Sequence, residues 1–477
     1  MRLLPLRTAF IGGAALVLVL WCFLLRSERS RPVLASFFSQ STSLDFLDQA
    51  RRELPLDLSP TIKYSRACIE ARLTPLAPRR EVANISRPLI ADQATLQLDP
   101  WKTPSVAIPR CQSIKLQVPE PYPAAEMFPH LIFGLATSYE RLRESFESIA
   151  HWCSHRDAKL IVIVSNWDER AANISLLQQE YRDGGIRASF IKPLDAAHTV
   201  SQSHFMVLTE MVKESGQDTR WFGLLDDDTF FPHLKPLSDA LGQLDHTTDL
   251  YVGTLAEDFG SIRNFGLMAY GGAGAYLSST LARKLGAPEQ AAVCVRESSV
   301  EWGDIIVRDC VYRHSKSRLT ILPGLYQQDL EGDTSGFFES GVEPINLHHW
   351  KSWYHEPVPR MAVAAKFCGN CFLQRFQFGR DTVLSNGYSI ATYRGGLEGV
   401  DLDKTEQTWN QRYPDVNPEY TFALGPLREK LGREEKKSYK LAHAQISGDT
   451  MRQLYVWRGN READEADEVV ELVWTRV

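Results

Sequence analysis

Three consecutive aspartates, Asp226, Asp227 and Asp228, follow the apolar run WFGLL and precede a second apolar segment, TFFP. Like charges placed side by side at the edge of a core repel one another unless a cation or hydrogen-bond donors compensate them. Carboxylate oxygens suit Mg²⁺ or Mn²⁺ bridged to phosphate. The triplet can also be a polar turn that caps a helix. A calcium loop of the EF-hand type is disfavoured, because Phe230 and Leu237 occupy ligand positions.

A glycine-rich stretch, YGGAGAYLS, occupies residues 270–278. Gly271, Gly272 and Gly274 permit positive φ and close approach of the backbone to a ligand, although a tight turn needs the same residues. The stretch does not match the dinucleotide fingerprint G-x-G-x-x-G, because position 277 is Leu, and no lysine completes a P-loop.

Two further segments carry groups that can do chemistry. Asp304, in VEWGDIIVRDCVY, is expected in the first turn of a helix, where it is either an ordinary cap or a general base for an acceptor hydroxyl. His348 and His349 follow the apolar run INL, and a neutral imidazole there can supply a second kind of metal ligand. Such a histidine pair can also be purely structural.

The elements that must position these residues alternate along the chain. Apolar runs at 131–137, 159–165 and 220–227 are typical of buried strands, and residues 250–256 and 267–278 are predicted to be further strands. Helical patterns occupy residues 175–185, 203–216 and 234–245. This alternation predicts an α/β domain with a mostly parallel sheet. The aspartates then lie at the carboxyl end of a strand, the edge at which such sheets bind ligands.

Residues 9–25 form an uncharged segment of seventeen residues, about 26 Å long as a helix. We expect it to be a transmembrane signal anchor behind a cytosolic tail, residues 1–8, because charged residues follow directly where a signal-peptide cleavage site would lie. A cleaved signal peptide is the alternative. The rest of the chain is then lumenal, in a single-pass type II arrangement.

Two further features agree with a lumenal location. Asn84 and Asn173 begin glycosylation sequons. Seven cysteines lie outside the apolar segment, enough for several disulfides and one remaining thiol. Cys368 and Cys371 have redox or metal spacing, but we favour a structural disulfide, because no second pair completes a zinc site.

Composition sets the domain organisation and excludes one class of partner. The net charge is -6 and no long basic run occurs, so nucleic acid is not expected as a partner. Twelve of the 25 prolines fall between Pro32 and Pro123, so residues 26–125 are expected to be a stem, with one weak helical pattern near residues 37–54. Residues 126–395 are expected to be the catalytic domain, and residues 396–477 a C-terminal extension.

Taken in order, WFGLLDDDTFF, YGGAGAYLS, EWGDIIVRDCVY, EGDTSGFFES and INLHHW resemble one family, the fringe-like branch of the β-1,3-glycosyltransferases, glycosyltransferase family 31. The segment CFLQRFQFGRDTVLSNGYSIATY extends the likeness to fringe-like proteins of plants and fungi. The resemblance covers roughly residues 128–395. It implies a GT-A fold, a UDP-sugar donor, and Mn²⁺ as the metal, with Mg²⁺ possible.

The resemblance also assigns roles to the acidic and histidine motifs. It makes Asp228 the direct metal ligand and His348 the residue that completes the metal site, with His349 one position away. It places Asp226 nearer the donor's ribose or sugar, and Asp227 within the same donor-binding motif.

The remaining roles concern the donor and the base. The resemblance implies that Ala136 and Thr137 cradle the uridine, that the glycine motif lines the donor sugar, and that Asp304 is the catalytic base. Fringe-type enzymes often carry paired acids at the base, whereas here Gly303 precedes Asp304.

The expected reaction is therefore inverting transfer of a sugar from a UDP-sugar to a glycan or glycoprotein hydroxyl, with a β-1,3 linkage, in the Golgi or endoplasmic reticulum membrane. A glycosidase that uses Asp228 and Asp304 as its carboxylate pair is one alternative. A non-catalytic, membrane-anchored protein that binds sugar or metal is another.

Overall fold

The computed structural model describes residues 44–75, 79–98, 111, 113–298, 300–410 and 420–477. The predicted membrane segment, residues 9–25, lies outside these residues. Among the helices of the described ranges, none combines the length and the apolar character needed to cross a membrane.

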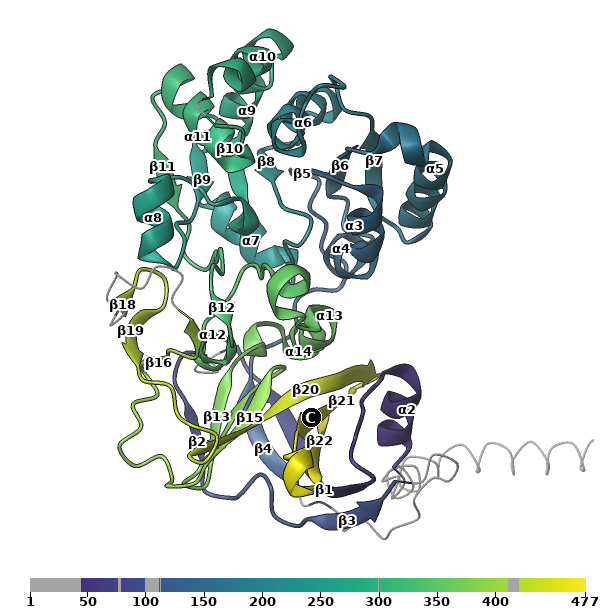
Figure 1. Cartoon of the computed structure of the whole chain (residues 1–477), viewed down its shortest axis with the longest axis vertical. Helices are drawn as coiled ribbons and strands as arrows, with labels where there is room; N and C mark the ends of the chain where they lie inside the picture. Colours follow the sequence, from purple (N-terminus) through teal and green to yellow (C-terminus); the bar gives the residue numbers. More distant parts are fainter. Residues whose placement is uncertain (1–43, 76–78, 99–110, 112, 299, 411–419) are drawn as a thin grey trace, which may run out of the picture.

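The first sheet of this mixed α/β fold has seven strands in the described part of the chain, in the order β11-β9-β10-β8-β5-β6-β7 (Figure 1). Strands β5, β6, β7 and β8 are parallel, whereas β10 is antiparallel to both β8 and β9. The strands are β5 (Leu131–Thr137), β6 (Lys159–Val164), β7 (Arg187–Ile191), β8 (Trp221–Leu224), β9 (Tyr251–Gly253), β10 (Ala275–Ser278) and β11 (Leu319–Ile321). The alternation of strands and helices predicted from the sequence is confirmed, although β9 and β10 are shorter than expected.

Helices pack against this sheet through their apolar faces. Helix α6 (Val200–Glu214) starts at a capping box formed by Thr199 and Gln202, and its buried residues join the core beneath β5 and β8. The other helices of this part are α3 (Tyr139–Glu144), α4 (Phe146–Cys153), α5 (Trp167–Asp183), α7 (Leu234–Gly242), α8 (Phe259–Phe265), α9 (Ser279–Leu285), α10 (Pro288–Glu297) and α11 (Gly303–His314).

Strand direction brings several loops to one edge of the sheet. Leu224 at the end of β8 pairs with Ala275 at the start of β10, because these strands are antiparallel. The residues that follow β8 therefore meet the residues that precede β10. The segments that follow β5, β9 and β11 open onto the same edge, since β5 is parallel to β8 and both β9 and β11 run opposite to β10.

The second sheet has ten strands within the described residues and lies below the first in Figure 1. Its path is β2-β13-β14-β15-β20-β21-β22-β1-β3, and β4 also pairs with β1. The strands are β1 (Thr61–Leu73), β2 (Ala83–Ile85), β3 (Ala94–Gln97), β4 (Ser113–Val118), β13 (Arg375–Phe378), β14 (Thr382–Ser385), β15 (Ser389–Tyr393), β20 (Lys436–Ser447), β21 (Thr450–Trp457) and β22 (Asp467–Arg476).

This sheet corrects the expected stem. The described part of residues 26–125 contributes helix α2 (Asp45–Glu53) and four strands, and β1 pairs in parallel with β22 over ten residue pairs from Ile62–Asp467 to Ala71–Arg476. The prolines misled the prediction because they lie between these strands and not within them. The weak helical pattern was a better guide, since α2 packs its apolar side onto the sheet.

The expected boundary at residue 395 is also wrong. Strands β13, β14 and β15, which precede it, continue directly into β20, β21 and β22, which follow it. Residues 396–477 are therefore not an accessory tail, because they complete a sheet that both ends of the described chain build. The short strands β12 (Glu331–Gly332), β16 (Thr405–Glu406), β17 (Trp409–Asn410), β18 (Tyr420–Thr421) and β19 (Gly425–Arg428) and helix α12 (Ser335–Glu339) lie between the two sheets (Figure 1).

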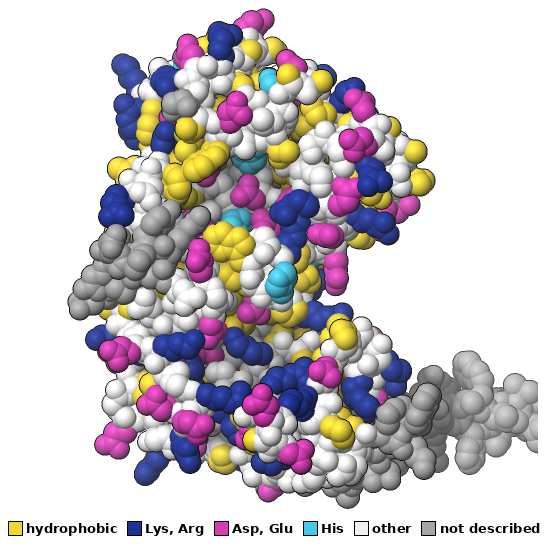
Figure 2. All heavy atoms as spheres, in the orientation of Figure 1, with side chains coloured by type: hydrophobic (Ala, Val, Ile, Leu, Met, Phe, Trp, Pro, Cys, Tyr) yellow, Lys and Arg dark blue, Asp and Glu magenta, His cyan; other side chains and the backbone are white. Residues whose placement is uncertain are grey.

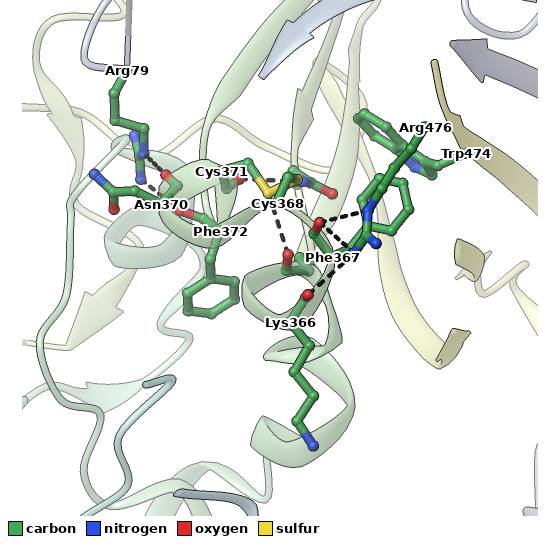
Figure 3. Close-up of a disulfide and its surroundings, with 12 residues drawn as sticks. Arg79, Lys366, Phe367, Cys368, Asn370, Cys371, Phe372, Trp474 and Arg476 are labelled. Atoms are coloured by element: carbon green, nitrogen blue, oxygen red, sulfur yellow. Dashed lines mark hydrogen bonds between the residues drawn. A yellow bond between two sulfur atoms is a disulfide. The ribbon is translucent and has the colours of Figure 1, made fainter. Parts of the chain in front are cut away.

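The predicted disulfide between Cys368 and Cys371 is confirmed, and it closes the end of helix α14 (Val363–Cys368) (Figure 3). Arg79, from the N-terminal part, donates to the Asn370 carbonyl at 2.5 Å, and Arg476, from β22, donates to the Phe367 carbonyl at 2.8 Å. The short helix is thus held by segments from both ends of the chain.

The other cysteines follow the expected pattern of several disulfides and one thiol. Cys68 pairs with Cys111, Cys294 pairs with Cys310, and Cys153 is a buried free thiol. The second disulfide joins α10 to α11, the helix that begins next to Asp304. The sequon residues Asn84 and Asn173 are both exposed.

Candidate active site

An isolated bridge places the histidine motif beside the aspartates. Phe230 and Leu347 exchange two backbone hydrogen bonds of 2.8 and 2.7 Å in antiparallel sense. His348 follows Leu347 and Asp228 lies two residues before Phe230, so the bridge sets the two side chains against each other. His348 Nε2 lies 3.1 Å from Asp228 Oδ1 and 3.5 Å from Asp226 Oδ2.

The Gln327 carbonyl fixes the tautomer of His348. Its Nδ1 lies 2.8 Å from the Gln327 carbonyl oxygen, which can only accept, so Nδ1 must carry a proton. In the neutral ring, the lone pair on Nε2 then points at the two carboxylates, as in histidines that bind metals. Burial would lower the pKa of His348, but the neighbouring Asp228 and Asp226 carboxylates hold it well above its ordinary value. The position therefore has the electrostatics of a cation site.

His349 adds a second imidazole. Ligand atoms of Asp228, His348 and His349 all lie within 4.8 Å of one another. His349 has a φ of +54°, a conformation that a non-glycine residue rarely adopts, and its ring stacks on Trp353 at 3.6 Å. Ser352 Oγ donates to Asp228 Oδ2 at 2.8 Å. These residues form a candidate metal site of one carboxylate and two imidazoles, with Asp226 beside it.

The three aspartates play different parts. Asp228 is almost fully buried, whereas the Asp226 side chain is 42% exposed and borders His348. Asp227 is buried but engaged elsewhere: Arg141 Nε donates to its carboxylate at 2.6 Å, and Thr137 and Lys351 also contact it. Asp227 therefore ties the end of β5 and the start of α3 to the aspartate loop.

The glycine motif makes room for this site. A Cβ on Gly272 would lie 2.0 Å from the His348 ring, whereas one on Gly271 would lie 3.4 Å from Asp226 Oδ1. Thr229 Oγ1 donates to the Gly272 carbonyl at 3.0 Å, which ties the motif to the aspartate loop. Gly274 faces away from these groups, because a Cβ there would meet Tyr276 and Leu225.

Asp304 lies at the start of α11, as predicted, and its carboxylate reaches the glycine motif. The Gly271 N–H donates to Asp304 Oδ2 at 3.4 Å. Burial and the Asp226 carboxylate raise the pKa of Asp304, and the nearby His204 partly offsets this effect. A carboxylate with a raised pKa, partly open to solvent, has the properties required of a general base.

Apart from Gly274, the predicted residues fall into two groups at one edge of the sheet. The first group, which surrounds the histidine and the base, is Asp226, Asp228, Gly271, Gly272, Asp304 and His348. The second group, Ala136, Thr137 and Asp227, lies at the end of β5 next to it. Figure 2 shows acidic and histidine side chains gathered in a hollow on the face that it presents.

Sequence reasoning missed the segment behind the histidines. Gln328 is fully buried with a φ of +57°, and its side-chain oxygen accepts from the His348 N–H. Asp329 Oδ1 lies 3.3 Å from His349 Nε2. Behind Asp329 lies Glu257, which is 1% exposed and accepts from the Asp329 N–H at 3.3 Å. No sequence signal marks these residues, since they act through contacts with segments up to 72 positions away.

The fold and the site define a mixed α/β protein with a carboxylate–imidazole site at the carboxyl edge of its first sheet. A profile described as Fringe-like matches residues 146–331, and a profile described as a protein of unknown function, DUF604, matches residues 262–467. The two overlap over residues 262–331, which contain the glycine motif and Asp304. The Fringe-like match confirms the resemblance found in the sequence motifs. No curated relative matches the sequence at a significant level.

Several solved structures are similar to part of this chain. Mouse xyloside xylosyltransferase 1 is 10% identical, with 41% of this chain and 85% of that chain covered at a TM-score of 0.27. A glycosyltransferase involved in glycosylation of the major capsid of PBCV-1 is 12% identical, with 47% and 96% covered at 0.27. The glycosyltransferase GlyE of Streptococcus pneumoniae TIGR4 is 19% identical, with 39% and 44% covered at 0.24.

Proposed function

We propose that the protein is a metal-dependent glycosyltransferase that moves a sugar from a UDP-sugar onto a hydroxyl of a glycan or glycoprotein. The match of residues 146–331 to the Fringe-like profile supports the class of reaction. The mixed sheet, in which one antiparallel strand interrupts parallel neighbours, suits the GT-A fold that the resemblance implies.

One observation carries the proposal: His348 Nε2 faces Asp228 and Asp226, while its Nδ1 is held by the Gln327 carbonyl. Carboxylate oxygens with imidazole nitrogen suit Mn²⁺, and Mg²⁺ is the alternative where oxygen ligands dominate. Asp228 and His348 would hold the ion, with His349 adjacent. When bound, a divalent ion neutralises negative charge on the diphosphate leaving group.

Other residues around the site would bind the ribose, sugar and uridine of the donor. Asp226, Gly271 and Gly272 form the wall nearest His348, where the donor's ribose and sugar would lie. Ala136 and Thr137, at the end of β5, would cradle the uridine, and Asp227 keeps that strand end in place through Thr137.

Asp304 is the proposed base. Its carboxylate accepts a proton from the acceptor hydroxyl as the hydroxyl oxygen forms the new bond to the anomeric carbon and the bond to the UDP oxygen breaks. A single base that acts on the face opposite the leaving group gives inversion at the anomeric carbon. The β-1,3 linkage, the N-terminal anchor and residence in the Golgi or endoplasmic reticulum belong to the same proposal.

The test is release of UDP from a panel of UDP-sugars with Mn²⁺, with Mg²⁺ and with EDTA. The proposal predicts release from at least one donor with metal and none with EDTA. A glycosidase that uses a carboxylate pair would instead hydrolyse glycosides in EDTA. Mn²⁺ binding without release from any donor would indicate a non-catalytic binding protein and would contradict the proposal.

A further inference from the structure

We propose that Phe265, Leu267 and Trp302 form an apolar platform that binds the C–H face of a pyranose ring of the acceptor, next to Asp304. This inference rests on the proposed function and adds to it a binding surface for the acceptor.

Trp302 and Leu267 present exposed apolar surface, and Phe265 joins Trp302 to the buried cluster around Met268 and Ile305. Trp302 is 53% exposed and Leu267 is 62% exposed, while Phe265 is half-buried. The rings of Phe265 and Trp302 pack edge to face, with centroids 5.0 Å apart. Contiguous exposed aromatic and aliphatic groups mark binding surfaces more often than isolated ones do. Figure 2 shows hydrophobic side chains bordering the hollow that contains the acidic and histidine groups.

The platform is tied to the side of α11 that carries the base. Arg308 lies one helical turn after Asp304, so the two side chains share a face of the helix. Arg308 donates to the Phe265 carbonyl oxygen at 2.5 Å, which fixes the end of α8 against that face. The Phe265 ring in turn contacts Trp302, the residue that caps α11.

The loop between α8 and the glycine motif also connects the apolar platform with Asp304. It leaves Phe265 at the platform and reaches Gly271, whose N–H donates to Asp304. Five residues lie between these two points, and Tyr312, also on α11, anchors the loop by donating to the Leu267 carbonyl at 2.8 Å. Helix α8, the loop after it and the start of α11 therefore hold the apolar surface next to the proposed base.

The chemistry of the surface matches a sugar ring better than a charged ligand. A pyranose has a face of C–H groups that packs on an aromatic ring and a rim of hydroxyls that can reach a carboxylate. Stacking on the platform would leave a rim hydroxyl directed at Asp304. Trp353, on the metal side, is less suited, because one face of its ring already stacks on His349.

The experiment is saturation-transfer NMR on the full-length protein with UDP and the diamagnetic ion Mg²⁺ present, with methyl glycosides of glucose, galactose, xylose, mannose and N-acetylglucosamine as probes. We expect saturation of C–H protons on one face of at least one glycoside. Trp302→Ala should weaken its binding roughly three- to tenfold, as loss of one aromatic contact would, and Trp302→Phe should restore most of it. Leu176→Ala, which removes a similarly exposed apolar side chain on α5, should leave the binding unchanged.

Two results would overturn the platform: no saturation of any of the five glycosides, or equal saturation in wild type and Trp302→Ala. The far-ultraviolet circular dichroism of Trp302→Ala should match wild type, because the side chain is mostly exposed. If wild type also fails to release UDP from any UDP-sugar, the proposed function fails; if release persists, the platform alone is wrong.

Discussion

His348 Nε2 lies 3.1 Å from Asp228 Oδ1, while the Nδ1 of the same ring lies 2.8 Å from the Gln327 carbonyl oxygen. The ring is thus clamped between a carbonyl, which fixes its tautomer, and a carboxylate, which faces its free nitrogen. The antiparallel bridge between Phe230 and Leu347 creates this relationship, because it aligns two segments more than 100 residues apart.

Replacing His348 should remove the metal site. We expect His348→Ala to weaken Mn²⁺ binding by roughly 100-fold or more, because it deletes a ligand and not only a residue that supports one. Isothermal titration calorimetry with Mn²⁺ measures the effect. His349→Ala is the matched variant, and a greater loss in His349→Ala than in His348→Ala would reverse the two assignments.

The two adjacent glycines should respond differently to alanine. In Gly272→Ala the new methyl group would lie 2.0 Å from the His348 ring, whereas in Gly271→Ala it would lie 3.4 Å from Asp226 Oδ1. We expect Gly272→Ala to lower the free energy of unfolding by roughly 1–3 kcal/mol and to weaken Mn²⁺ binding. Gly271→Ala should keep both properties near wild type. Thermal denaturation and Mn²⁺ titration of the pair check this, and indistinguishable variants would contradict it.

The buried carboxyl of Glu257 should make stability depend on pH. Burial and the neighbouring Asp329 carboxylate raise its pKa from 4.5 to about 8, so the folded protein holds this proton more tightly than the unfolded chain does. Its contribution is fully present below about pH 4.5 and is lost as the pH rises through about 8.

Glu257→Gln should therefore flatten the fall in stability between about pH 5 and about pH 8, by a few kcal/mol. Urea denaturation at several pH values measures the free energy of unfolding. The exposed Glu169→Gln serves as the control and should leave the profile unchanged. A wild-type profile that rises over this range, or one that Glu257→Gln does not alter, would show that Glu257 is not held protonated.

The second sheet should be essential to the fold, although it looked like a stem and an extension in the sequence. Trp474, in β22, is fully buried, and its Nε1 donates to Gln453 Oε1 at 2.8 Å. Trp474→Ala should destabilise the protein by roughly 3–5 kcal/mol, whereas Val477→Ala, at a residue 65% exposed, should change little. A Trp474→Ala variant with an unaltered melting temperature would mean that this sheet does not unfold with the rest of the protein.

Local patterns revealed the first sheet but not the second. The strands ending at Thr137 and Leu224 are continuous apolar runs, and the helices between them have clear periodicity and caps. Strand β1 pairs with β22, and the partners Ile62 and Asp467 are 405 positions apart. Neither segment has a local pattern that indicates with which strand it pairs. The high proline content indicated a stem because prolines disrupt strands, but these prolines lie between the strands and leave the sheet intact.

In the candidate site, too, local motifs reveal some residues, whereas others depend on contacts between distant segments. Asp228, Asp304 and His348 could be singled out because carboxylates and imidazoles occur in motifs with a recognisable order. The structure separates Asp227 from Asp226 by its bonds to Arg141 and Thr137, which the triplet alone does not reveal. Gln328 and Glu257 were missed because their importance comes only from burial and from contacts across the fold.

The most direct test of the account is to change Asp304, the proposed base, while the metal site is left intact. Asp304→Asn keeps the shape of the side chain and removes its ability to accept a proton at neutral pH. With a UDP-sugar that wild type uses, we expect transfer to an acceptor to fall by at least roughly 100-fold. Binding of Mn²⁺ and UDP, measured by calorimetry, should stay within about threefold of wild type. Wild-type turnover in Asp304→Asn would contradict the central claim that Asp304 is the base.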